Sequence, residues 1–271
     1  LVGMDDVMGL KGWQWLFILE GLPSCVLGIV VLFALPDRPA NAKWLSPEER
    51  GIVEADLARD RLAASGRSHH AMWPALVDRR VLVLCGVYFG VVIGLYGIGL
   101  WLPQIAKAMG YSNAAVGFIV AAPYAVSAVA MLAWGRRSDR SGERAGHVAA
   151  AALVSVAGLL ASLYFSTPWI ALCCLGLASV GIYACLGPFW AMPPLFLQGT
   201  AAAGGIALIN SVGNLGGFAG PYLMGWIKEH TGSFSLGMAA MAGCLGAAAI
   251  LALSLKREMR AMGDARAPGP G

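Results

Sequence analysis

The sequence contains few charged residues. Asp, Glu, Lys and Arg make up 13% of its 271 residues, whereas hydrophobic residues make up 58% and the mean hydropathy is +0.68. A soluble globular domain carries about 25% charged residues. Half that share leaves too little polar surface to keep a chain of this length in water. The composition therefore excludes the soluble class and indicates an integral membrane protein.

Patterns typical of disulfide frameworks and metal sites are also missing. The six cysteines lie in apolar runs, without the spacing of a disulfide-rich domain or a zinc site. We expect them to be small buried hydrophobic residues. None of the four histidines lies near a Cys or a carboxylate at ligand spacing, so we expect no metal and no cofactor. A membrane-embedded enzyme needs a cluster of such groups, and we predict that the chain is not an enzyme.

Long apolar stretches make up most of the chain. A helix that crosses the hydrocarbon needs about 20 mainly apolar residues, and seven stretches of this sequence qualify. Lipid offers the backbone no hydrogen bonds, so we expect helices. The fifth stretch contains Pro188, Pro193 and Pro194, which predicts a bend or break. The seven predicted spans cover residues 13–35, 80–105, 113–134, 147–166, 168–197, 202–227 and 233–255.

Lysine and arginine gather at one end of these spans. Sixteen of the 19 lie in 36–80, in 135–146 or after Leu255, and the other three are Lys11, Lys107 and Lys228. Positively charged loops stay in the cytoplasm. We therefore predict that the N-terminus lies outside and the C-terminus inside. An outside start without a signal sequence predicts that an odd number of spans precedes Leu1.

The segment 36–79 is the sizeable soluble piece of the sequence. Its stretch "LSPEER" supplies Ser46 as N-cap, Pro47 at the first helical position and Glu49 three residues after the cap. This predicts a short cytoplasmic helix over about 46–62. The helix is either a regulatory or partner-binding arm or a linker that packs on its own protein, as surface amphipathic helices usually do.

A cluster of charges separates the third and fourth spans. The stretch "WGRRSDRSGER", residues 134–144, contains Gly135, Asp139, Arg140, Gly142 and Arg144. Their spacing resembles the G-x-x-x-D-R-x-G-R-R/K loop of the major facilitator superfamily, which occurs once in each half of those transporters. The resemblance implies a conformational latch, a loop that holds neighbouring helices together when the transporter faces outward.

The residue types fit such a latch. Gly135 lets a helix end approach its neighbour, Asp139 caps a helix or pairs with an arginine, and Gly142 permits a tight reversal. The alternative is a positive-inside anchor, for which the two arginines after Gly135 suffice. That alternative leaves Asp139 and the glycines unexplained, so we favour the latch.

A second resemblance narrows the family and covers nearly the whole chain. "GWQWLFILEGLP" with "LPDRPANAKWLSPEER" is similar to the sixth helix and central loop of the anion:cation symporter family, which includes phthalate, tartrate, hexuronate and galactonate permeases. "FWAMPPLFLQGTAAAGGIALINSVGNLGGFAGPYLMGW" is similar to its tenth and eleventh helices. The family keeps its cationic substrate ligand and proton-carrying acids in the first five helices, which would precede Leu1.

The resemblance implies an all-α integral membrane bundle in which about seven of twelve transmembrane helices are visible. It divides the chain into four parts. Residues 1–35 form the last helix of the N-terminal half, 36–79 the central cytoplasmic loop with a short helix, 80–255 the C-terminal six-helix half and 256–271 a cytoplasmic tail.

Helical geometry selects candidate binding residues. Asn210 and Asn214 are four residues apart and share a face, whereas the glycine seam (Gly213, Gly216 and Gly220) lies about a quarter turn away and should pack on another helix. An amide in a span needs a polar partner. The resembling family places a substrate-contacting amide at Asn210, whereas Asn214 either faces the cavity or hydrogen-bonds a neighbouring helix.

Two aromatic residues join this candidate substrate-binding set. Trp190 follows Pro188 where the helix is interrupted, and such interruptions mark binding sites in transporters. Tyr96 can hydrogen-bond a carboxylate, although a tyrosine in a membrane helix is more often part of the core or the interface. The candidate substrate-binding residues are thus Asn210, Trp190, Tyr96 and Asn214.

The sequence therefore predicts a proton-coupled symporter for a small organic anion, working by alternating access in a bacterial inner membrane. Its expected partners are the anion, protons, membrane lipid and the N-terminal half of the same transporter, and no nucleic acid. The alternative is a non-transporting sensor or a membrane-embedded enzyme. A sensor would need a sizeable output domain, and segment 36–79 is small.

Overall fold

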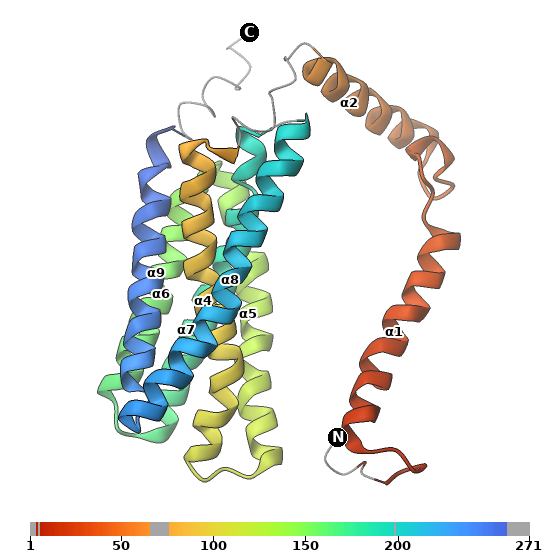
Figure 1. Ribbon diagram of the computed structural model, residues 1–271. Coiled ribbons are helices and arrows are strands. Elements are labelled where there is room, and N and C mark those ends of the chain that lie inside the picture. The colour runs from red at the N-terminus through yellow and green to blue at the C-terminus, as the bar shows by residue number, and fades with distance from the viewer. Residues whose placement is uncertain (1–3, 5, 66–75, 198, 259–271) are drawn as a thin grey trace. The chain divides into compact units, whose positions relative to one another are not determined.

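The computed structural model describes residues 4, 6–65, 76–197 and 199–258, and over this part the chain is built of helices, with one isolated bridge between Val7 and Leu10. The predicted all-α fold is confirmed (Figure 1). The helices are α1 (Gly12–Ala34), η2 (Pro39–Asn41), α2 (Pro47–Ser65), α4 (Arg79–Ala108), α5 (Asn113–Ser141), α6 (Ala145–Tyr164), α7 (Pro168–Trp190), η3 (Pro193–Leu195), α8 (Gly199–Thr231) and α9 (Ser235–Ser254).

The chain divides into two compact units, Leu1–Ser68 and His69–Gly271. The first contains α1, η2 and α2, and its predicted capping box is confirmed. Ser46 N donates to Glu49 Oε2 over 2.9 Å, and Glu49 N donates to Ser46 Oγ over 3.2 Å. The Ser46 backbone N–H, and to a smaller extent the Ser46 hydroxyl, lower the pKa of the Glu49 carboxyl. The cap explains why α2 begins at Pro47.

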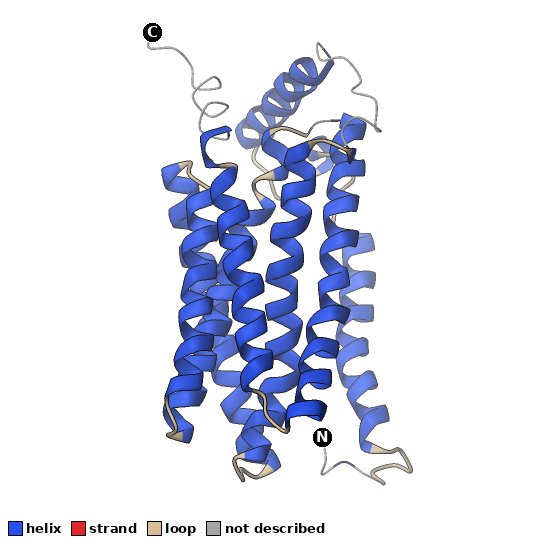
Figure 2. Cartoon of the chain, turned by 60° about the vertical axis from the view of Figure 1, so that its left-hand side comes forward, coloured by secondary structure: helices blue, strands red, loops and turns tan. Residues whose placement is uncertain are grey.

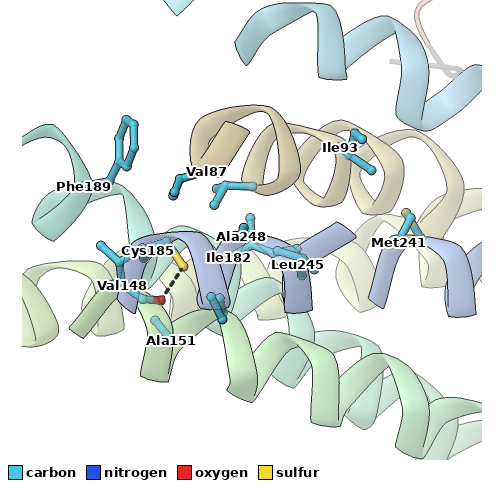
Figure 3. Packing of buried hydrophobic residues seen from close by; sticks show 14 of the residues in the cluster. Val87, Ile93, Val148, Ala151, Ile182, Cys185, Phe189, Met241, Leu245 and Ala248 are labelled. Carbon is cyan, nitrogen blue, oxygen red and sulfur yellow. Dashed lines mark hydrogen bonds between the residues drawn. The ribbon is translucent and has the colours of Figure 1, made fainter. Parts of the chain in front are cut away.

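The second unit is a helical bundle formed by α4 to α9 (Figures 1 and 2). Helix α4 contacts α8, α9, α7 and α5, and α6 packs on α7 and α9. The core contains Val87 and Ile93 of α4 together with Ile182 of α7 and Leu245 of α9 (Figure 3). Helix α4 is therefore the central element of the bundle, and it carries the longest series of buried residues among the described helices.

The cysteines follow the expectation only in part. Cys85 and Cys185 are buried, and Cys185 Sγ donates to the Val148 carbonyl oxygen over 3.5 Å (Figure 3). Cys25 and Cys173 are exposed, so the expectation of buried side chains is wrong there. Exposure of a thiol on a membrane helix is tolerated because the surrounding hydrocarbon is as apolar as a protein core.

Six described helices are long and apolar enough to cross a membrane: α1, α4, α5, α6, the stretch Pro168–Leu195 that contains α7, and the stretch Ser235–Glu258 that contains α9. They match six of the seven predicted spans. The seventh corresponds to α8, which spans 33 residues but is not among the six. Its glycines and the polar amides of Asn210 and Asn214 lower its hydropathy.

The glycine seam of α8 packs against α4, as the sequence predicts, although the sequence does not name the partner helix. A Cβ built on Gly216 would lie 2.6 Å from the Phe89 carbonyl oxygen, and one on Gly220 would lie 2.6 Å from that of Ile93. These contacts are between backbones, so neither side can yield by changing a rotamer. Glycine is required there because a side chain would force the two helices apart.

The structure corrects one helix end expected from the sequence, that of α5, and confirms another, that of α7. Helix α5 continues to Ser141, so most of the predicted loop 135–146 is helical and the connection to α6 is only Gly142–Arg144. A helix need not end at the hydrocarbon boundary, because its last turns can carry charged side chains into water. The predicted break after Pro188 is confirmed: α7 ends at Trp190, and the 3-10 turn η3 follows.

Candidate functional site

Trp190 lies at the end of α7 and belongs to an aromatic cluster. The Tyr88 ring of α4 stacks on Phe189 with centroids 5.1 Å apart and meets the edge of Trp190 at 4.9 Å. A Cβ on Gly213 of α8 would overlap the Tyr88 ring. Three helices therefore meet at this cluster, and the half-buried Trp190 is fixed by its neighbours at the interruption of the helix.

Asn210 and Asn214 lie one turn apart on α8, and both are exposed. Asn214 Nδ2 donates to the backbone oxygen of Asn210 over 2.8 Å and to Asn210 Oδ1 over 2.9 Å. Asn214 thus bonds within its own helix. Within the described part of the chain, no group accepts from Asn210 Nδ2. That amide N–H is available to a ligand, and its direction is set by Asn214.

Tyr96 of α4 is 44% exposed, and its ring lies against Gly217 of α8, where a Cβ would be 3.1 Å from Tyr96 Cδ2. Tyr183 of α7 packs edge-on against Tyr124 of α5, with centroids 5.7 Å apart. Tyr96, Tyr124 and Tyr183 thus come from α4, α5 and α7, which contact one another.

We call the group formed by Tyr88, Tyr96, Tyr124, Tyr183, Trp190, Asn210 and Asn214 the polar-aromatic wall. It offers hydroxyl, amide and indole groups together with ring faces. It carries no charge, since the described Lys and Arg residues of α4, α5, α7 and α8 lie near the helix ends. Such groups can bind an oxygen-rich small molecule through neutral hydrogen bonds and ring contacts, and they cannot neutralise a ligand's negative charge.

The sequence analysis missed Tyr124 and Tyr183. Tyr183 lies seven residues before Trp190, and a separation of two turns places both side chains on one face of α7. That spacing is the signal that could have found it. Near these tyrosines in sequence are Ser127 and Ser179, whose buried Oγ atoms have no hydrogen-bond partner among the described residues.

The turn between α5 and α6 is the second candidate site. Gly142 adopts a left-handed conformation with φ of 65°, which permits the tight reversal expected of it. Asp139 Oδ1 accepts from Arg144 Nη1 over 2.5 Å, so it pairs with an arginine as expected. Arg144 Nη1 also donates to Ser138 Oγ over 3.2 Å. These contacts join the last turn of α5 to the residue before α6.

Gly135 and Arg140 have different surroundings. A Cβ on Gly135 would meet no atom within 4 Å, but one on Gly187 of α7 would lie 3.6 Å from the Gly135 Cα. The close approach expected at Gly135 therefore depends on Gly187. Arg140 is exposed and, among the described residues, has no ion-pair partner.

Glu143 is the most connected residue of this turn, and the sequence analysis missed it. Its carboxylate accepts from Gly146 N over 2.7 Å, lies 3.1 Å from His147 Nδ1 and is 3.9 Å from Lys256 Nζ beyond α9. The expectation that no histidine lies near a carboxylate is therefore wrong for His147. The four-residue separation of the two was the available signal.

The pKa of Glu143 reflects these contacts. Burial raises it, but the hydrogen bonds from Gly146 and His147 and the charge of Lys256 together lower it below the usual value. Because the folded-state pKa is lowered, the stabilisation is present at neutral pH and is lost as pH falls through that pKa. Glu143 thus stays ionised under physiological conditions and joins the α5–α6 turn to the end of α9.

Comparison with known proteins identifies relatives. The sequence matches the Major Facilitator Superfamily over residues 7–221 and again over 84–269. It is 48% identical over 258 residues to a protein of Agrobacterium vitis named "Putative tartrate transporter", covering 95% of this chain and 57% of the relative. A second protein with that name from the same organism is 46% identical over 268 residues, covering 99% of this chain and 62% of the relative.

A third relative is the "Quinolone resistance transporter" of Acinetobacter baumannii. It is 37% identical over 239 residues, which are 88% of this chain and 55% of the relative. The chain thus spans less than two thirds of the length of each of these relatives. All three carry the names of transporters rather than of enzymes, in agreement with the prediction that the chain is not an enzyme.

Proposed function

The chain belongs to the major facilitator superfamily, and from this premise we propose that it forms the C-terminal part of a proton-coupled symporter for a small organic anion such as a dicarboxylate. The observation that carries the proposal is the 48% identity to a relative named as a tartrate transporter. Transport proceeds by alternating access, with this half rocking against an N-terminal half around a site near the middle of the bilayer.

The polar-aromatic wall supports this proposal. Tartrate carries hydroxyl groups as well as carboxylates, and both accept hydrogen bonds from amide, indole and hydroxyl donors. The wall is uncharged, so the cation that meets the anion's charge comes from the N-terminal half. Asn210 Nδ2 and the Tyr96 hydroxyl then contact the side of the substrate that faces α4 and α8.

Uptake by sealed vesicles tests the proposal. We expect vesicles that contain the full-length protein to accumulate labelled tartrate, and accumulation to rise when the outside is made acidic relative to the lumen. A protonophore should abolish that rise. Tartrate binding without any uptake would instead favour a sensor. Uptake at the same rate with and without the pH gradient would contradict proton coupling.

We further propose a bacterial inner-membrane location, with the α5–α6 turn and the C-terminus in the cytoplasm. The support is the charge asymmetry. The end of α5 and the turn after it carry Arg136, Arg137, Arg140 and Arg144, whereas the C-terminal ends of α4 and α8 carry Lys107 and Lys228.

This topology predicts a labelling pattern. In intact cells, a membrane-impermeant thiol reagent should modify Lys228→Cys but not Ser141→Cys, in a background without other reactive cysteines. Ser141→Cys should become modified after the cells are opened, which controls for its accessibility. Labelling of position 141 alone in intact cells would reverse the proposed orientation.

The α5–α6 turn is proposed to act as the latch. Asp139 joins α5 to the start of α6 through Arg144, and Glu143 extends the connection to α9. Asp139→Asn removes the charge from the Arg144 pair while keeping the side-chain shape. We expect this change to slow transport several-fold and to leave substrate affinity within a few-fold, because in the described part of the chain no hydrogen bond or ion pair joins Asp139 or Arg144 to the polar-aromatic wall.

The matched control for the latch is Asp56→Asn, which breaks the exposed pair with Arg59 on α2. Exposed pairs contribute about 0–1 kcal/mol, so transport should not change. Equal transport rates in the Asp139 variant and the unmodified protein would contradict the latch. The turn would then serve only to orient the protein in the membrane.

A further inference from the structure

A basic cavity opens at the α5–α6 end of the bundle. It has a volume of about 860 Å³ and is lined by the end of α5, the start of α6 and Lys256. Arg136, Arg137 and Arg140 all contribute to its lining and are exposed. Within the described part of the chain these three arginines have no ion-pair partner, whereas Arg144 is paired with Asp139.

The charge of this cavity is strongly positive. Its acidic residue, Glu143, is already paired with His147 and Lys256. The beginning of α6 adds the partial positive charge of a helix N-terminus. Three guanidinium groups are therefore left uncompensated. Guanidinium groups bind phosphate oxygens through paired, charge-assisted hydrogen bonds, so the cavity suits a phosphate group.

An apolar groove continues from this cavity along the membrane-spanning helices. A hollow of about 360 Å³ between α5, α6 and α7 shares Ala133, Trp134 and Arg137 with the basic cavity. A further hollow of about 440 Å³ shares Val180 with it and extends to Ile119 on α5. The two hollows follow one another along α5 and α7 from the basic cavity, and together we call them the α5–α7 groove.

The dimensions of the α5–α7 groove fit an acyl chain. From Ala133 to Ile119 the helix rises about 21 Å at 1.5 Å per residue, which exceeds half of the roughly 30 Å hydrocarbon core. Trp134 stands at the junction, where its indole N–H donates to the His147 carbonyl oxygen over 3.0 Å. Tryptophan is typical of the level at which lipid headgroups meet hydrocarbon.

We propose that this surface binds an anionic phospholipid, with its phosphate-containing headgroup in the basic cavity and one acyl chain in the α5–α7 groove. A free phosphate would use the arginines but would leave the groove unexplained. A zwitterionic lipid would use the groove but would bring a positive group toward the arginines. The inference depends on the membrane-spanning fold and on no particular transported substrate.

Native mass spectrometry of the full-length protein in detergent tests this site with phosphatidylglycerol, phosphatidylcholine and inorganic phosphate. We expect phosphatidylglycerol to bind, phosphatidylcholine to bind much more weakly and inorganic phosphate not to displace the bound lipid. The triple variant Arg136→Gln, Arg137→Gln, Arg140→Gln should bind phosphatidylglycerol roughly a hundredfold more weakly, at about fivefold per lost charge. The control triple variant Arg38→Gln, Lys43→Gln, Arg59→Gln removes the same charge elsewhere and should bind normally.

A second pair of variants tests the groove without changing charge. Ala133→Trp fills the junction between cavity and groove, and it should weaken phosphatidylglycerol binding at least tenfold. Ala128→Trp, on the same helix but lining neither hollow, should not. Thermal unfolding of each variant shows that the fold is kept. Equal binding of both lipids, displacement by inorganic phosphate, or normal lipid binding by Ala133→Trp would each overturn the proposal.

Discussion

Replacement of Gly216 by leucine is expected to prevent the α4–α9 bundle from folding. The first added carbon alone would lie 2.6 Å from the Phe89 carbonyl oxygen and 3.1 Å from Ile93 N. Overpacking of a core typically costs about 1–3 kcal/mol even where side chains can move. Here the opposing atoms are backbone atoms of the central helix, so α8 would have to separate from α4 along its length.

The measurement is the yield of monodisperse protein by size exclusion and its thermal unfolding in detergent. Gly243→Leu is the matched control, because Gly243 lies on α9, is exposed and has no atom within 4 Å of an added Cβ. The control should give nearly normal yield. If Gly216→Leu behaved like Gly243→Leu, the packing of α8 on α4 would be looser than the contacts indicate.

Removal of the Asn210 side chain is expected to weaken substrate binding without destabilising the protein. A hydrogen bond to a charged ligand contributes about 1.5–3 kcal/mol, so affinity should fall roughly ten- to a hundredfold in Asn210→Ala. The fold should persist because Asn214 Nδ2 would keep its 2.8 Å bond to the backbone oxygen of residue 210. Tartrate binding by calorimetry and uptake by vesicles measure the effect.

Asn113→Ala serves as the control for Asn210→Ala. Asn113 lies at the start of α5, where its side chain accepts from Lys107 Nζ over 2.6 Å, and a helix rise of about 16 Å separates it from Tyr124, the wall residue on that helix. Its loss should leave affinity unchanged. Normal affinity combined with a lower unfolding temperature in Asn210→Ala would show that the amide is structural and that the substrate contacts other residues.

Local patterns in the sequence predict local structure well in this protein. The capping box at Ser46, the interruption after Pro188 and the left-handed Gly142 each depend on a few neighbouring residues, and each is confirmed. The limits of the predicted membrane spans follow from the lengths of the apolar stretches in the sequence. The ends of α5 and α8 extend beyond the predicted limits, because hydropathy marks where hydrocarbon ends and not where helical hydrogen bonding ends.

Contacts between distant segments could not be predicted in the same way. The glycines of α8 indicate a close neighbour, but only the fold shows that α4 is that neighbour. Tyr88 and Trp190 are separated by about a hundred residues and meet because α4 and α7 are adjacent. The contact of Glu143 with Lys256 likewise joins the α5–α6 turn to residues after α9, which are far away in sequence.

The shortness of the connection between α5 and α6 has a consequence for biogenesis. Gly142–Arg144 reverses the chain with hydrogen bonds supplied almost entirely by its own neighbourhood: Ser138 Oγ donates to the Glu143 carbonyl oxygen, and Gly146 N donates to the Glu143 carboxylate. The contact with Lys256 is longer, at 3.9 Å. The turn can therefore form while the ribosome is still synthesising α7, and α7, which packs on both α5 and α6, then holds the two helices in place.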